Sequence, residues 1–123
     1  MTRGIRIRVE TEYKPEHSTP SGGRWFFAYH IHIANEGQET VQLVSRRWVI
    51  TDAHGNVRHV EGPGVIGQQP VLEPGASFAY TSACPLETPF GSMHGTYQMT
   101  VRGGTAFEAR IPAFPLRMPG AVH

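Results

Sequence analysis

The sequence predicts an all-β protein, a sandwich of about seven or eight antiparallel strands. Three observations lead to this prediction. Apolar residues alternate with polar ones in several segments, which is the period of a strand with one buried face. Turn signals rich in glycine, proline and asparagine separate these segments at short intervals. No apolar stripe with a helical period extends over ten or more positions, so helices are not expected.

The first half of the chain is expected to form three strands. Residues 5–13 carry apolar side chains, threonine and tyrosine on one parity and arginine or glutamate on the other, as in a half-buried strand. Residues 14–23 combine proline, serine and glycine without a period and predict a mobile surface loop. Aromatic and β-branched residues dominate 24–35, and the apolar segment 41–52 follows a turn at 35–38. Both segments therefore predict strands.

The second half is expected to hold shorter strands joined by longer connections. Residues 57–60 form a short strand that leads into a glycine-rich loop. Residues 77–82 alternate around a phenylalanine and a tyrosine and predict another strand. Residues 84–95 contain two prolines and two glycines, and we interpret them as a loop.

The last part of the chain is expected to be a hairpin with an irregular tail. Residues 96–102 and 105–111 are strand-like and are joined by Gly103-Gly104, a two-residue hairpin signal. From Ala113 onward the proline-rich tail predicts irregular structure, and its last residues are expected to fray.

Two aromatic residues favour an immunoglobulin-like sandwich. Trp48 lies in the third expected strand, where such domains bury a tryptophan between their sheets. Tyr97 has the position of a tyrosine corner, and Met99 takes the place of the disulfide cysteine that would follow it. The alternative is that both aromatics are ordinary core residues of another all-β fold.

The bulk composition limits the compartment and the partners. A chain of 123 residues fits a single domain, 1–123, with its own core. The one cysteine, Cys84, cannot form an intramolecular disulfide, which favours a reducing compartment, the cytoplasm. We find no run of apolar residues long enough for a signal peptide or a membrane span. A net charge of +1 gives no basic patch for nucleic acid or anionic lipid, so neither partner is expected.

Gly62, Gly64 and Gly67 spell GxGxxG, the fingerprint of dinucleotide-binding loops. In that site the glycines open a helix whose N-terminus holds the pyrophosphate, but here the β-branched Val65 and Ile66 follow and no helix is expected. One interpretation is a structural connector between sheets. The other is a nest of backbone N–H groups that binds phosphate without a helix.

His30 and His32 lie two positions apart on one face of a strand, a spacing that suits two metal ligands. A complete site needs further histidines or carboxylates to converge on them. The alternative is a pair of solvated histidines on the outer face. Cys84 precedes Pro85 without the surroundings of a cysteine hydrolase, so we expect a structural thiol. No catalytic constellation and no cofactor are expected.

Several motifs together resemble the ApaG family, also labelled CorD. They are WVITD, GVIGQQPVL, PGASFAYTS and TPFGSMHG, within a match from about Ile5 to Leu116. The resemblance implies one ApaG domain with a fibronectin type III or immunoglobulin-like sandwich. It also implies a small cytoplasmic protein linked to cobalt resistance and magnesium efflux. Similar domains within eukaryotic proteins resemble protein-interaction modules, and the family's glycine motif has been likened to a pyrophosphate-binding loop.

The expected function is a non-enzymatic binding module in divalent-cation (cobalt/magnesium) homeostasis, acting through an unknown protein partner. Its binding face is expected to combine the loops 62–69 and 88–95, because loops at the ends of a sandwich are displayed on a rigid support. The alternative is a binder of nucleotide or polyphosphate at Gly62, Gly64 and Gly67, with a divalent metal. A third hypothesis is direct cobalt binding by the histidine pair. The protein is expected to be a monomer or a homodimer.

Overall fold

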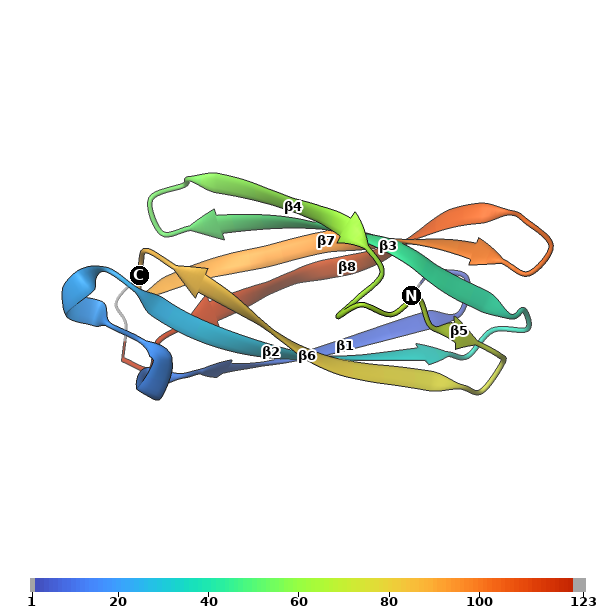
Figure 1. Ribbon diagram of the computed structural model, residues 1–123, viewed down its shortest axis with the longest axis horizontal. Coiled ribbons are helices and arrows are strands. Elements are labelled where there is room, and N and C mark those ends of the chain that lie inside the picture. The colour runs from blue at the N-terminus through green and yellow to red at the C-terminus, as the bar shows by residue number, and fades with distance from the viewer. Residues whose placement is uncertain (1, 121–123) are drawn as a thin grey trace.

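The computed structural model describes residues 2–120 and is a sandwich of two antiparallel β-sheets (Figure 1). Its eight strands confirm the predicted all-β class. Two short 3-10 turns, η1 (Pro15–His17) and η2 (Pro20–Gly22), lie between the first two strands. The strands are β1 (Ile5–Tyr13), β2 (Trp25–Asn35), β3 (Val41–Asp52), β4 (Val57–Pro63), β5 (Val71–Leu72), β6 (Ser77–Leu86), β7 (Phe90–Val101) and β8 (Ala106–Arg117).

The strand order is that of an immunoglobulin-type sandwich. One sheet has the order β1-β2-β6, and the other has the order β4-β3-β7-β8, with the two-residue β5 also paired to β3. In immunoglobulin-type domains two such sheets face each other. Here β1, β2 and β6 form one sheet, and β3 and β7 are neighbours at the centre of the other. The predicted immunoglobulin or fibronectin type III-like fold is therefore confirmed.

Trp48 is the centre of the core, as predicted. It is 2% exposed and packs edge-to-face on Tyr29 of the opposite sheet, with ring centroids 5.5 Å apart. Phe114 and Tyr97 surround the same indole at 5.8 and 6.5 Å. Met99 is 1% exposed, so a packed thioether fills the place of a disulfide half. These aromatic contacts tie the two sheets together without a covalent bridge.

The tyrosine corner differs from its usual form. In that motif the hydroxyl bonds to the backbone a few residues upstream. The Tyr97 hydroxyl instead lies 2.6 Å from the hydroxyl of Tyr80 on β6, and this hydrogen bond is buried. Burial raises the pKa of both phenols, so the pair stays neutral. The contact again joins one sheet to the other.

The prediction of a loop over 84–95 is wrong for most of that range. β6 continues to Leu86 and β7 begins at Phe90, which leaves three residues for the turn. Gly91 and Gly95 led to the wrong prediction because glycine usually marks loops. Within β7 they have another role: an added Cβ would lie 2.5 Å from Thr51 O at the first and 2.0 Å from Arg47 O at the second. They are glycines because β3 approaches β7 closely.

The prediction of an irregular tail from Ala113 is also wrong. β8 continues to Arg117 and passes through Pro112 and Pro115. It is an edge strand, and an edge tolerates proline where the missing N–H would face solvent. The same reason explains Pro85 in β6 and Pro63 at the end of β4, which are also edge strands. The expected fraying concerns residues 121–123 and lies outside the described residues.

The segment 14–23 is a surface connection, as expected, and it is built from the two 3-10 turns. Neither turn contains a buried residue. The Ser18 hydroxyl fixes the segment to the sheet, because it donates to Lys14 O at 2.8 Å and accepts from Phe26 N–H at 2.9 Å. Within residues 2–120 no helix has the length and hydrophobicity needed to cross a bilayer.

Candidate functional site

The glycine-rich segment between β4 and β5 folds back on β3. The Gly64 N–H donates to Val44 O at 2.8 Å, which fixes the start of the loop. Val65 and Gln68 then exchange backbone hydrogen bonds of 2.8 and 2.9 Å and close a tight two-residue turn. Val65 is fully buried and anchors the turn in the core. The loop is thus a hairpin tip, and no helix follows it, as predicted.

The tip of this turn is strained. Its central residues, Ile66 and Gly67, have φ values of 42° and 78°. Two consecutive positive φ values are typical of a type I′ turn, which favours asparagine and glycine. A β-branched residue in this region is an outlier. Ile66 is also 54% exposed, so no packing in the core explains its presence.

The three motif glycines serve different purposes. A Cβ on Gly64, where φ is 59°, would lie 2.2 Å from Gln68 O, so only glycine closes the turn. A Cβ on Gly62 would lie 2.8 Å from Arg46 Nη1, and that guanidinium donates to Pro63 O and Gly64 O at 3.3 and 3.1 Å. Gly67 has open space around it. These contacts support the interpretation as a connector.

The phosphate-binding hypothesis for Gly62, Gly64 and Gly67 has one argument on each side. The N–H groups of Gly64, Val65 and Gln68 donate to carbonyls of the protein, so these three are not directed at an anion. A nest needs several converging N–H groups. Arg46, however, brings a positive charge to the same loop. Phosphate binding stays a prediction.

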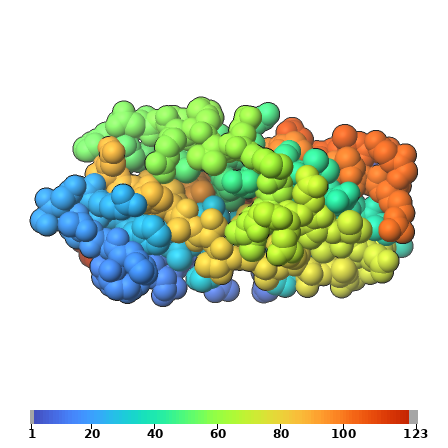
Figure 2. All heavy atoms as spheres, in the orientation of Figure 1, coloured from blue at the N-terminus to red at the C-terminus, as the bar shows by residue number. Residues whose placement is uncertain are grey.

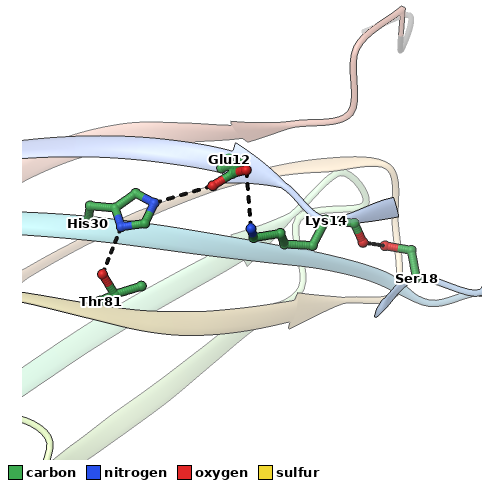
Figure 3. A network of polar contacts seen from close by, with 5 residues as sticks. All are labelled: Glu12, Lys14, Ser18, His30 and Thr81. Atoms are coloured by element: carbon green, nitrogen blue, oxygen red, sulfur yellow. Dashed lines mark hydrogen bonds and ion pairs between the residues drawn. The ribbon is translucent and has the colours of Figure 1, made fainter. Parts of the chain in front are cut away.

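His30 and His32 lie on the outer face of β2, both half-exposed, as the alternative interpretation predicts. Figure 3 shows His30 between two neighbours: its Nδ1 is 2.8 Å from Thr81 Oγ1 and its Nε2 is 3.4 Å from Glu12 Oε1. The hydrogen bond from Lys14, followed by the contact with His30, holds the pKa of Glu12 below its usual value. Both nitrogens of His30 therefore have a protein partner.

The histidine pair gains no third metal ligand. Among residues 2–120 no group of three or more histidine, cysteine, aspartate or glutamate side chains is placed to hold a metal ion. Arg8 and Glu10 of β1 line the same shallow hollow as the two histidines, so its charge is mixed. Metal binding by His30 and His32 stays a prediction.

The binding face expected from loops 62–69 and 88–95 does not form. Thr88 is buried and its hydroxyl accepts a hydrogen bond from Ala53 N–H just after β3, whereas Gly64 N–H donates to Val44 O near the start of that strand. Val44 and Ala53 are nine positions apart along extended chain, a distance of roughly 30 Å. The two segments therefore lie at opposite ends of β3.

A groove between the edges of β4 and β6 was not predicted. Arg58 of β4 reaches across it, and its Nη2 donates to Pro85 O at 3.0 Å and lies 3.7 Å from Cys84 Sγ. Cys84 is 2% exposed, and burial raises the pKa of its thiol, an effect that Arg58 opposes. Cys84, which was expected to be a structural thiol, therefore lines this groove. No local motif could have indicated this contact, because its two residues are 26 positions apart.

Comparison with known proteins places the chain in a family. A family model described as the ApaG domain matches residues 15–101, more than half of the 123 residues. The chain belongs to the ApaG family. Protein ApaG of Rhodospirillum centenum is 55% identical over 119 residues, which cover 97% of this chain and 92% of the relative. Protein ApaG of Anaeromyxobacter sp. (strain K) is 53% identical over 123 residues, or 100% and 97% of the two chains.

A solved structure with the same fold also covers the strands outside 15–101. The crystal structure of an ApaA protein from Bordetella pertussis has a TM-score of 0.92 and 46% identity, and the alignment covers 95% of each chain. The glycine loop, the histidine pair and the groove at Arg58 all fall within the matched ApaG domain. The resemblance suggested by the sequence motifs is therefore confirmed.

Proposed function

We propose that the chain is a non-enzymatic binding module that acts in cytoplasmic cobalt and magnesium homeostasis by contacting a protein partner. The cation part of this proposal rests on the resemblance to the ApaG, or CorD, family. The binding part rests on one observation, the strained and exposed side chain of Ile66. Strained backbone at an exposed tip points to function, because nothing in the fold benefits from it.

Ile66 is displayed on a rigid support. Val65 beside it is fully buried, and the turn is closed by two backbone hydrogen bonds. Figure 2 shows the segment that links β4 to β5 standing on the face toward the viewer. Val71, which follows this segment, is 51% exposed and adds a second apolar side chain. A preformed apolar tip loses little entropy on binding, which suits a small anchor for a partner's pocket.

Replacing Ile66 with asparagine separates binding from stability. Asparagine tolerates positive φ, and Asn-Gly is the preferred pair of a type I′ turn, so the melting temperature should stay equal or rise. We expect the purified partner to bind the variant about tenfold more weakly, because the apolar anchor is gone. Pull-down identifies the partner, and titration with the parent and Ile66→Asn chains measures the loss.

The matched control is Val57→Asn, which removes an equally exposed side chain, also 54%, from β4. It should leave partner binding unchanged. In cells that lack the gene, the parent and Val57→Asn chains should restore cobalt tolerance and Ile66→Asn should not. Equal binding by Ile66→Asn and the parent would contradict the role of Ile66 in binding. Equal cobalt tolerance in cells without any copy of the gene would contradict the cation role.

A second candidate function is binding of a nucleotide or polyphosphate at the glycine loop. Arg46 favours it, because its guanidinium lies against Gly62 and donates to Gly64 O at 3.1 Å. Guanidinium groups bind phosphate oxygens well. Addition of ATP, with and without magnesium, should then shift the amide NMR signals of the motif glycines at millimolar ligand. Unshifted signals at Gly62, Gly64 and Gly67 would eliminate this candidate.

A further inference from the structure

The groove between β4 and β6 leads into a cavity of about 320 Å³ between the two sheets. Its walls are about equally polar and apolar, and the apolar part includes Trp48 and Met93 of β7. A second cavity of about 260 Å³ adjoins it and shares Ile50, Arg58 and Pro85 with it. Clefts of this order of size that combine apolar walls with placed polar groups are typical of small-molecule sites.

The lining of the larger cavity carries positive charge, whereas Asp52 and Glu87 line the smaller cavity that shares Arg58 with it. Two guanidinium groups, Arg46 and Arg58, line the larger cavity, and its lining contains no aspartate or glutamate. Within residues 2–120 both arginines donate to backbone carbonyls, and neither forms an ion pair with a carboxylate. Arg47, in contrast, is paired with Glu61 at 2.9 Å on the outer face. Uncompensated guanidinium beside apolar walls favours an anion.

An unpartnered donor lies among the same walls. Trp48 lines the cavity and is 2% exposed, and its Nε1–H, which solvent does not reach, has no hydrogen-bond partner in the described part of the chain; the same holds for Nε1–H of Trp25, outside the cavity. A buried donor without a partner is costly and rare in folded proteins. Tyr29 and Ser82 add hydroxyl groups to the lining. The cavity lining therefore combines two guanidinium groups, two hydroxyl groups and apolar side chains.

We propose that this cavity binds a small organic anion with an apolar body and one carboxylate head. The carboxylate would bind Arg58 at the mouth or Arg46 at the end beside the glycine loop. The apolar body would lie against Trp48, Ile50 and Met93. Charge complementarity with the two guanidinium groups selects this class over a neutral apolar molecule. The site is separate from the exposed tip at Ile66.

The test uses 4-phenylbutyrate and its neutral counterpart 4-phenylbutan-1-ol, followed by NMR of the intact chain. We expect the acid to bind at least about tenfold more tightly than the alcohol, since charged hydrogen bonds are lost with the alcohol. The acid should shift the indole N–H signal of Trp48. Trp25 lies outside the cavity lining and its signal should stay in place, which provides an internal control.

Charge-removing variants locate the head group. Arg58→Met and Arg46→Met keep an apolar stem, and at least one should weaken binding of the acid by about tenfold. Arg47→Met, the neighbour on the outer face, should bind within about twofold of the parent. Equal affinities for acid and alcohol, shifts at Trp25 instead of Trp48, or an equal loss in Arg47→Met would each overturn the proposal. The acid and alcohol comparison needs no variant, so a variant that fails to fold leaves the test intact.

Discussion

Replacing Gly95 with alanine should lower the free energy of unfolding by about 3 kcal/mol or more, because overpacking between two backbones has no simple relief. An added Cβ would lie 2.0 Å from Arg47 O and 3.2 Å from the Cα of Trp48. Gly95 pairs with Trp48 on one side and Ile111 on the other, so it lies within the sheet. Relief would require β3 and β7 to move apart beside the core tryptophan. Urea unfolding of the two chains measures the difference.

The matched control is Gly67→Ala at the tip of the glycine loop. No atom lies within 4 Å of the added Cβ there, and the cost comes from the positive φ of 78° alone. A loss of about 1 kcal/mol is expected for alanine in that conformation. If both variants lost the same stability, close approach of β3 to β7 could not be the reason for glycine at position 95.

The buried pair of tyrosine hydroxyls is expected to give the second large effect. Tyr80 and Tyr97 are 6% and 0% exposed, and their hydroxyl oxygens are 2.6 Å apart. Tyr97→Phe or Tyr80→Phe leaves the remaining hydroxyl buried without this partner, so each should cost about 1–3 kcal/mol. The double variant removes both polar groups and should cost clearly less than the sum of the two single losses.

A double-mutant cycle measured by urea unfolding gives the coupling of the two hydroxyls. We expect a coupling of about 1–2 kcal/mol, as for groups in direct contact. Tyr13→Phe is a suitable control, because Tyr13 lies at the end of β1 and is half-exposed. If the stability lost by the double variant equalled the sum of the losses of the two single variants, the two hydroxyls would not stabilise each other.

The fold could be predicted because alternation and turn chemistry are local properties of the sequence. Segment 5–13 alternates apolar and charged residues, and the structure pairs all nine of its residues with β2. Trp48 could be placed between the sheets because a large aromatic in a central strand has few other positions. Strand ends were predicted less well, because Gly91 and Pro115 carry local signals for loops that pairing with neighbouring strands overrides.

The candidate sites depend on contacts that no local pattern specifies. The GxGxxG spacing suggested an anion site. In the structure, Gly64 is needed to close the turn, and the exposed side chain is that of Ile66, a position that the motif leaves open to any residue. Arg58 meets Cys84 only because β4 and β6 are the edges of opposite sheets. Residues that are far apart in the sequence and meet only in the fold, as Arg58 and Cys84 do, give no signal in a single sequence.

The prolines of the edge strands bear on how copies of this chain meet at high concentration. β4, β6 and β8 each carry at least one proline, which removes an N–H donor from an outer edge and obstructs the addition of a foreign strand. β1 is also an outer edge, and it has no proline but bears a row of arginines and glutamates, while the edge strand β5 is only two residues long. Aggregation through strand addition is therefore opposed by missing donors on β4, β6 and β8 and by charge on β1.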